Sequence, residues 1–385
     1  MSLVIGGGRV VTPQGTIEAD IHVADGRIAG IGTSLRGGEA LDASGCTVVP
    51  GFIDLQVNGG FGHDFTSQPR SIWDVGARLP EHGVTSFMPT IVSAERRRID
   101  EAISVVAAGP PAGYHGAGVL GLHIEGPFLA ADRRGAHRQD HLAAPDLDTV
   151  AEWRPPGVRM VTIAPELPGA EGVVRELAGR GVVVAAGHSS AGWETLEQAK
   201  GWGVTHGTHL FNAMSGVSHR HPGLAGFLLA DPDLTCGIIV DGWHLHPGAV
   251  RLAWRAKGPG EIALVTDSMA GLGMADGRYS LGGVTVDVTS GVARTTEGRL
   301  AGGAASFDTA LRLLIEATGC RLEEAALAAA TTAATIIGDR ERGRLLEGAI
   351  ADLTVLDGDL AVAATVVGGS VAHERGHEGR DHGDA

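Results

Sequence analysis

The sequence predicts an α/β protein, a closed parallel (β/α)8 barrel of the TIM type with a small β-sandwich domain formed by both chain ends. Eight short apolar runs alternate with longer helix-compatible stretches through the middle of the chain. This alternation is typical of parallel strands that are covered on both faces. Short strand-like runs recur at both ends. The chain of 385 residues exceeds the roughly 100 to 200 residues of one ordinary domain, which leaves room for both parts.

The small domain is predicted at residues 1–49 and 340–385. Short β-type runs near the start are separated by the turn residues Pro13-Gln14-Gly15 and Asp25-Gly26, a spacing typical of hairpins. The chain returns to β character near its other end, and we assign both segments to one domain. Residues 373–385 carry three histidines and several charges, which predict a disordered tail rather than a functional one.

The barrel is predicted over residues 50–339. Its apolar runs lie at 48–57, 85–89, 119–124, 160–164, 182–186, 204–209, 236–240 and 262–265. Helix-compatible stretches lie at 71–81, 94–108, 172–180, 193–200, 246–257, 307–318 and 322–334. Residues 277–303 predict a β-rich insertion. An open, doubly wound sheet gives a similar alternation and stays an alternative at this point.

Composition and charge exclude several classes of function. A net charge of −15 disfavours nucleic acid as a partner. The only lysines are Lys200 and Lys257, but a local arginine can still hold a small anion.

Cys46, Cys236 and Cys320 have no C-x-x-C spacing, so neither a disulfide framework nor a thiolate zinc site is predicted. We expect a cytoplasmic protein, because the start lacks a leader pattern and no apolar run approaches about 18 residues.

Polar side chains close several of the predicted strands, at the end of a parallel barrel where active sites lie. Gln56 and Asn58 are two residues apart, so both point to the same face. The other strand ends carry Glu125, His188, His209 and Asp267. A lone polar residue at a strand end is usually a helix cap. Four such residues at the same end of one barrel favour an active site. Two histidines and a glutamate form a common catalytic zinc ligand set that leaves a position open for water, and Asp267 would then act as acid and base.

Four motifs surround these residues: Leu-His-Ile-Glu-Gly-Pro-Phe at 122–128, Ala-Gly-His-Ser at 186–189, Thr-His-Leu-Phe-Asn-Ala-Met at 208–214 and Pro-Gly-Leu-Ala-Gly at 222–226. With them the sequence resembles the N-acetylglucosamine-6-phosphate deacetylase family, a branch of the amidohydrolase superfamily, over essentially the whole chain. Many amidohydrolases carry His-x-His on the first strand, where this chain has Gln56-Val57-Asn58. Because amides are poor metal ligands, Gln56 and Asn58 indicate a vestigial second-metal position.

The resemblance therefore implies one divalent metal ion per chain, held by Glu125, His188 and His209. Zn2+ fits these ligand types best, with Fe2+ or another divalent ion as alternatives. The implied reaction is hydrolytic deacetylation of N-acetyl-D-glucosamine 6-phosphate to D-glucosamine 6-phosphate and acetate, in amino-sugar catabolism and recycling. A metal-activated water attacks the amide carbonyl, Asp267 moves the proton and His244 stabilises the oxyanion.

The resemblance also implies the residues that contact the substrate. Arg220 would bind the phosphate, because a guanidinium forms a strong cationic fork for phosphate. The other implied contacts are His137, Asn212, Ala213, His244, Ala301 and Gly302. The family usually forms homodimers with the phosphate end near the subunit boundary, which implies a homodimer here.

Three other interpretations stay open from the sequence. Trp243 before His244, and Ser268 after Asp267, depart from the usual pattern, so the preferred substrate could be the galactosamine epimer. Another amidohydrolase acting on cyclic amides would need a bridging carboxylated lysine, and neither lysine closes a predicted strand. A barrel that serves as a non-catalytic scaffold would not need the complete set of strand-end residues.

Overall fold

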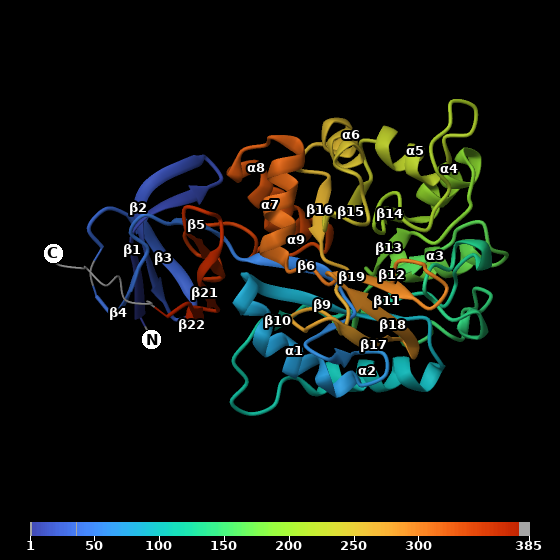
Figure 1. The fold of residues 1–385 in the computed structure, drawn as a ribbon, viewed down its shortest axis with the longest axis horizontal. Helices are drawn as coiled ribbons and strands as arrows, with labels where there is room; N and C mark the ends of the chain where they lie inside the picture. The colour runs from blue at the N-terminus through green and yellow to red at the C-terminus, as the bar shows by residue number, and fades with distance from the viewer. Residues whose placement is uncertain (1, 36, 377–385) are drawn as a thin grey trace.

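The computed structural model describes residues 2–35 and 37–376, and it confirms the predicted fold class (Figure 1). Parallel strands close a barrel, and a mixed sheet built from both chain ends lies beside it. The barrel strands are β6 (Phe52–Val57), β9 (Val84–Val92), β11 (Leu122–Glu125), β12 (Val158–Ile163), β13 (Val183–Ala186), β14 (Val204–Gly207), β15 (Thr235–Ile239) and β16 (Ile262–Val265). The short β10 (Gly118–Val119) adds to β9 just before β11.

The barrel closes between its first and last strands. Val57 forms a parallel bridge with Ser268, and the Asn58 N–H donates to the Ser268 carbonyl at 2.8 Å. Each of the eight predicted runs overlaps a barrel strand. Because the first and last strands meet, the closed barrel replaces the open-sheet alternative. The first run also included β5 (Thr47–Pro50), which belongs to the other sheet.

Helices surround the barrel. They are α1 (Ile72–Arg78), α2 (Arg96–Ala108), α3 (Ala170–Gly179), α4 (Trp193–Trp202), α5 (Gly223–Ala230), α6 (Pro247–Lys257), α7 (Phe307–Thr318), α8 (Leu322–Ala326) and α9 (Thr332–Ile336), with the π-helical turn η5 (Leu327–Thr331) between the last two. The 3-10 turns are η1 (Pro69–Ser71), η2 (Leu79–His82), η3 (Ala131–Arg133) and η4 (Gln139–His141). No helix-compatible stretch was predicted between residues 124 and 160, and there a loop with only η3 and η4 leads from β11 to β12.

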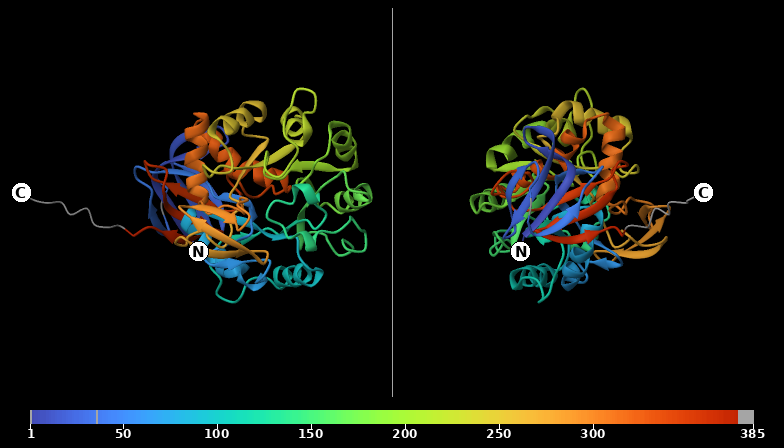
Figure 2. Two further views of the ribbon diagram at one scale, coloured as in Figure 1. Left: turned by 45° about the vertical axis from the view of Figure 1, so that its right-hand side comes forward. Right: turned by 90° about the vertical axis from the view of Figure 1, so that its left-hand side faces the viewer.

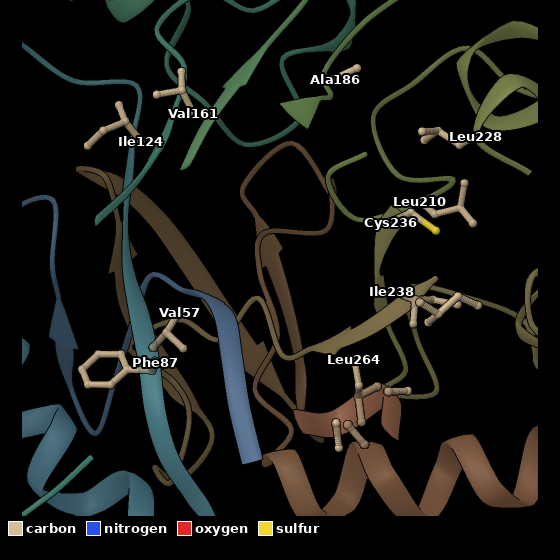
Figure 3. Packing of buried hydrophobic residues seen from close by; sticks show 14 of the residues in the cluster. Val57, Phe87, Ile124, Val161, Ala186, Leu210, Leu228, Cys236, Ile238 and Leu264 are labelled. Atoms are coloured by element: carbon tan, nitrogen blue, oxygen red, sulfur yellow. The ribbon is translucent and has the colours of Figure 1, made fainter. Parts of the chain in front are cut away.

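Two apolar clusters fill the barrel wall and its interior. Outward-facing side chains such as Val57, Phe87, Val161 and Leu264 pack against the surrounding helices (Figure 3). Inward-facing side chains of the same strands, with residues of α9, form a second cluster below the strand ends: Ile53, Leu55, Met88, Met160, Ala185, Ile239, Ala263, Val265, Ala333, Ala334 and Ile337. The interior is therefore a packed core, and only its carboxyl-end rim is free to form a site.

The two chain ends form one mixed sheet in the order β22-β21-β20-β5-β1-β2-β3, with β4 paired to β1 (Figure 2). Its strands besides β5 are β1 (Ser2–Thr12), β2 (Gly15–Ala24), β3 (Arg27–Gly32), β4 (Glu39–Asp42), β20 (Leu353–Leu356), β21 (Val362–Val367) and β22 (Ser370–Glu374). Antiparallel pairing of β5 with β20 joins the two ends. His373 and Glu374 lie in β22, so the predicted disorder is wrong for them, and residues 377–385 of the predicted tail lie outside the described part.

The predicted β-rich insertion is a three-stranded antiparallel sheet of β17 (Gly277–Leu281), β18 (Val284–Thr289) and β19 (Val292–Thr295). Its apolar face packs on the barrel rim through Val286 and Val288, which contact the cluster of Val92 and Met269. A second, two-stranded hairpin, β7 (Gly59–Gly60) and β8 (His63–Asp64), follows β6. Within the described residues, no helix combines the length and apolar character that crossing a membrane requires.

Candidate active site

A cavity of about 520 Å³ opens at the carboxyl ends of the barrel strands. Most of the predicted site residues line it: Asn58, Glu125, His137, His188, His209, Asn212, Ala213, His244, Asp267 and Gly302. Gln56 and Ala301 are buried without lining the cavity. Arg220 is exposed on the loop before α5 and is also not among the lining residues. Of the three predicted residues that do not line the cavity, Arg220 is the exposed one.

Three strand-end residues in this cavity have a left-handed backbone. The φ angles are 48° at His188, 32° at His209 and 51° at Asp267. Residues other than glycine rarely adopt this conformation, which costs on the order of 1 kcal/mol or more and occurs preferentially at functional sites. The sharp turn at each strand end directs these side chains toward the cavity, and packing of the barrel supports the strain.

Glu125, His188 and His209 bring three ligand atoms together. Oε1 of Glu125 lies 3.2 Å from Nε2 of His188 and 3.0 Å from Nε2 of His209, and the two nitrogens are 3.0 Å apart. Nδ1 of His188 lies 2.8 Å from the carbonyl of Arg133, and a carbonyl can only accept. Nδ1 therefore carries hydrogen, and neutral His188 turns a lone pair on Nε2 toward the carboxylate. Two acceptors this close require a cation or proton between them, so the donor set fits a metal ion.

His137 is close to the same carboxylate but in a different role. Glu125, His137 and His188 each have a ligand atom within 4.8 Å of the others. However, Nδ1 of His137 accepts from the backbone N–H of Ser93 at 3.2 Å. The hydrogen of its neutral ring is then on Nε2, 3.6 Å from Oε2 of Glu125. His137 is thereby arranged as a donor to the carboxylate, whereas His188 is arranged as a ligand.

The charges of this cluster depend on one another. Burial works to raise the pKa of Glu125, but its interactions with His137, His188 and His209 outweigh burial and hold that pKa well below its usual range. Burial lowers the pKa of His188 to about 4. Burial also acts to lower the pKa of His209, but its hydrogen bond to Glu125 raises it overall. The cluster therefore combines an ionised carboxylate with a neutral imidazole, as a metal site requires.

Gln56 and Asn58 hold the carboxylates of the site. Nε2 of Gln56 donates to Oε1 of Glu125 at 3.1 Å, and Nδ2 of Asn58 donates to Oδ1 of Asp267 at 2.8 Å. The pairing of β6 with β9 shifts register between Asp54 and Val57, a type of irregularity that often lies beside active sites. Both amides thus act as hydrogen-bond donors to carboxylates of the site.

Asp267 lies at the end of the barrel's last strand, with its side chain in the cavity. Burial, and then the negative charge of Glu125, raise the pKa of Asp267 to about 6. A carboxyl group with a pKa close to neutral can both accept and return a proton at working pH. Its position next to the ligand cluster is the arrangement expected of a general acid and base.

Asp54 lies directly beneath Asp267 and was not predicted from the sequence. Its Oδ2 accepts from the Thr266 hydroxyl at 2.5 Å, and Oδ1 accepts from the Thr266 and Gln56 backbone N–H groups at 3.3 and 3.2 Å. These bonds tie the first barrel strand to the residue before Asp267. Burial raises the pKa of Asp54 to about 7. Asp54 does not line the cavity. Its hydrogen bonds to Thr266 instead hold the backbone next to Asp267 in place.

His244 is fixed by a carboxylate of its own loop. Nδ1 of His244 lies 2.7 Å from Oδ2 of Asp241, and Oδ1 of Asp241 accepts from the backbone N–H groups of Trp243 and His244. Burial works to raise the pKa of Asp241, but the hydrogen bond from His244 leads to a lower value overall. Nε2 is the ring nitrogen left for the cavity. Asp241 was not among the predicted site residues, and only the structure shows that it orients His244.

The two lysines form ion pairs and do not contribute to the cavity lining. Lys200, in α4, pairs with Asp231 and Asp233 at 2.8 and 2.7 Å. Lys257, in α6, pairs with Glu261 at 2.7 Å. Neither lines the cavity. A bridging carboxylated lysine, which the cyclic-amide alternative requires, is therefore ruled out for this site.

Comparison with known proteins gives a consistent result. The model of the amidohydrolase family matches residues 47–373. The chain is 40% identical over 390 aligned residues to N-acetylglucosamine-6-phosphate deacetylase of Homo sapiens, covering 96% of this chain and 90% of that protein.

Two solved structures are similar over nearly their whole length. N-acetylglucosamine-6-phosphate deacetylase from Thermotoga maritima has a TM-score of 0.89 and 31% identity, covering 97% of this chain and 100% of that one. A substituted form of the enzyme from Mycobacterium smegmatis, in complex with N-acetyl-D-glucosamine-6-phosphate, has a TM-score of 0.87 and 34% identity, covering 97% and 99%. Similarity at this level extends to the barrel and to the sheet formed by the chain ends.

Proposed function

The chain belongs to the amidohydrolase family, and from this premise we propose that it hydrolyses N-acetyl-D-glucosamine 6-phosphate to D-glucosamine 6-phosphate and acetate. The observation that carries the proposal is the buried cluster of Glu125, His188 and His209 beside Asp267, in a chain that matches enzymes of this activity from end to end. The reaction breaks the amide C–N bond. The oxygen of water goes to the acetyl carbon and a proton goes to the sugar nitrogen.

We assign the metal ligands as Glu125, His188 and His209, and the ion as Zn2+, with Fe2+ as the alternative. When bound, the ion supplies a water acidified toward neutral pH and polarises the acetamide carbonyl. Gln56 orients Glu125 through its 3.1 Å hydrogen bond. The Arg133 carbonyl fixes the tautomer of His188, a role that outer residues commonly have around metal ligands.

Asp267 takes a proton from the attacking water on its carboxylate and then delivers it to the departing nitrogen. Asn58 holds Oδ1 of Asp267 during both steps. His244, oriented by Asp241, presents Nε2 to the carbonyl oxygen as negative charge develops there. His137 contacts sugar hydroxyls, and Asn212, Ala213 and the segment of Ala301 and Gly302 contact the rest of the substrate.

An acetate-release assay tests this function directly. We expect turnover of N-acetylglucosamine 6-phosphate, with lower kcat/KM for its galactosamine epimer and for the unphosphorylated sugar. Higher kcat/KM for the epimer would reassign the substrate while keeping the chemistry. No acetate release from any of the three compounds by metal-loaded protein would favour the scaffold interpretation and contradict the proposal.

Arg220 is assigned to the phosphate, as the family pattern implies. Because Arg220 is exposed outside the cavity of its own chain, it acts from the boundary between two copies of a homodimer. Arg220→Ala should raise KM for the phosphorylated sugar roughly tenfold or more, with little change for the unphosphorylated sugar, since it removes a charge-assisted contact. Equal effects on both substrates in steady-state assays would show that the arginine is misassigned.

A further inference from the structure

The β-rich insertion brings a charged turn to the rim of the cavity. After β19, residues 295–299 close on themselves: the Thr295 N–H donates to the Arg299 carbonyl at 2.8 Å, and the Gly298 N–H donates to the Thr295 carbonyl at 2.8 Å. Arg299 lines the cavity, as does the next residue, Leu300. Because the insertion is packed on the rim through its own apolar cluster, this turn holds Arg299 in a defined place.

Arg299 and Arg134 share one carboxylate. Nη2 of Arg299 lies 3.2 Å from Oε2 of Glu297, and Nη2 of Arg134 lies 3.8 Å from the same oxygen. Nε of Arg134 is buried without a hydrogen-bond partner in the described structure. Two guanidinium groups therefore meet one carboxylate, which leaves a net positive charge and an unused donor at the cavity. The third lining arginine, Arg133, donates its Nε to Ser190 instead.

Arg134 and Arg299 line the cavity together with Gly135 and Ala213. Nη1 of Arg299 donates to the carbonyl of Gly135 at 3.1 Å. A Cβ on Gly135 would lie 3.8 Å from Cβ of Ala213 and 3.3 Å from Cε1 of His188. The loop that carries Arg134 is thus packed against the Asn212–Ala213 loop. The same loop lies beside the imidazole of His188.

We propose that Arg134 and Arg299 are specificity-determining residues that bind the phosphate monoester of the substrate. Before the substrate binds, the carboxylate of Glu297 pairs with both guanidinium groups. This inference rests on the proposed function. A phosphate dianion offers more charge and more acceptor atoms than one carboxylate, and guanidinium forks match it in geometry. The Glu297 side chain is 61% exposed, so it can turn into solvent when the phosphate takes its place.

The test uses Arg134→Gln, Arg299→Gln and Glu297→Gln in the metal-loaded protein. Each arginine variant should raise KM for the phosphorylated sugar roughly tenfold or more with kcat largely retained, and should leave kcat/KM for the unphosphorylated sugar unchanged. Glu297→Gln should lower KM for the phosphorylated sugar, because it removes a competitor for the two guanidinium groups. Arg278→Gln is the matched control, since Arg278 lies in the same insertion, 70% exposed and paired with Asp287.

A purely structural role of the two arginines would give a different pattern of kinetic effects in these variants. If the two arginines only tied the insertion to the loop of Gly135, their variants would affect both sugars equally and Glu297→Gln would weaken binding too; that pattern overturns the proposal. Calorimetric binding of D-glucosamine 6-phosphate supplies a readout besides activity, and its Kd should rise in both arginine variants. If the parent protein releases no acetate, the proposed function fails, but this binding experiment still decides the role of the arginines.

Discussion

Asp267→Asn should lower kcat for acetate release by about 10³-fold while the protein keeps its metal ion. Removing a group that both accepts and donates the transferred proton typically costs about 10²- to 10⁴-fold in rate. Asparagine preserves the size of the side chain and an oxygen that can accept the 2.8 Å hydrogen bond from Asn58. The geometry of the rim should therefore survive the loss of the base. Steady-state kinetics and metal analysis of the same preparation measure both parts of the prediction.

The matched control is Asp54→Asn, the same change at the buried carboxylate beneath Asp267. Burial raises the pKa of Asp54 to about 7, so a neutral amide resembles a protonation state that is populated near neutral pH. Asp54 does not line the cavity, and we expect kcat within about tenfold of the parent value. Near-normal turnover in Asp267→Asn would remove Asp267 from the mechanism. An equal loss in both variants would mean that the rim, and not the base, had been disturbed.

Removing the metal should abolish acetate release, and one equivalent of Zn2+ per chain should restore it. The stoichiometry follows from Gln56 and Asn58, whose amides donate to Glu125 and Asp267 and leave no second set of ligands. Metal-free protein should also melt at a lower temperature, because a ligand at about 1,000 times its Kd stabilises the folded state by about 4 kcal/mol. Metal analysis and thermal unfolding with and without chelator measure these effects independently of activity.

His188→Ala should lose the ion together with activity, since it removes one of three converging ligand atoms. His246→Ala is its control. His246 is an exposed histidine whose side chain accepts from the Gly248 N–H at the start of α6, so metal content should stay normal. Two ions per chain in the parent protein would contradict the argument from Gln56 and Asn58.

The strand-end residues could be predicted because a parallel barrel gives each of them a strong local signal. Glu125, His188, His209 and Asp267 each close an apolar run, and the topology alone directs the ends of those runs to one rim. The tautomer of His188 could not be predicted in this way, since it depends on a carbonyl 55 positions away at Arg133. Contacts of this kind arise from packing and leave no periodic trace in the sequence.

The errors in the predicted fold have similar causes. Helix α5, missing from the predicted stretches, is almost entirely apolar and contains Gly223 and Gly226, so it has no amphipathic period to detect. No helix-compatible stretch was predicted for the segment after β11, and that loop carries Arg133, Arg134 and His137 of the cavity rim. Arg299 was missed because it lies in the β-rich insertion, and only the folded chain brings it next to Gly135.

Pairing of β5 with β20 also determines when this protein can finish folding on the ribosome. Thr47 pairs with Leu356, so one partner strand leaves the exit tunnel about 300 residues after the other. At about 5 to 20 residues per second this delay lasts about 15 to 60 s. Throughout it, the edge of β5 stays open to unwanted strand pairing. A message truncated before β20 should therefore yield an aggregating chain even though every metal ligand has been translated.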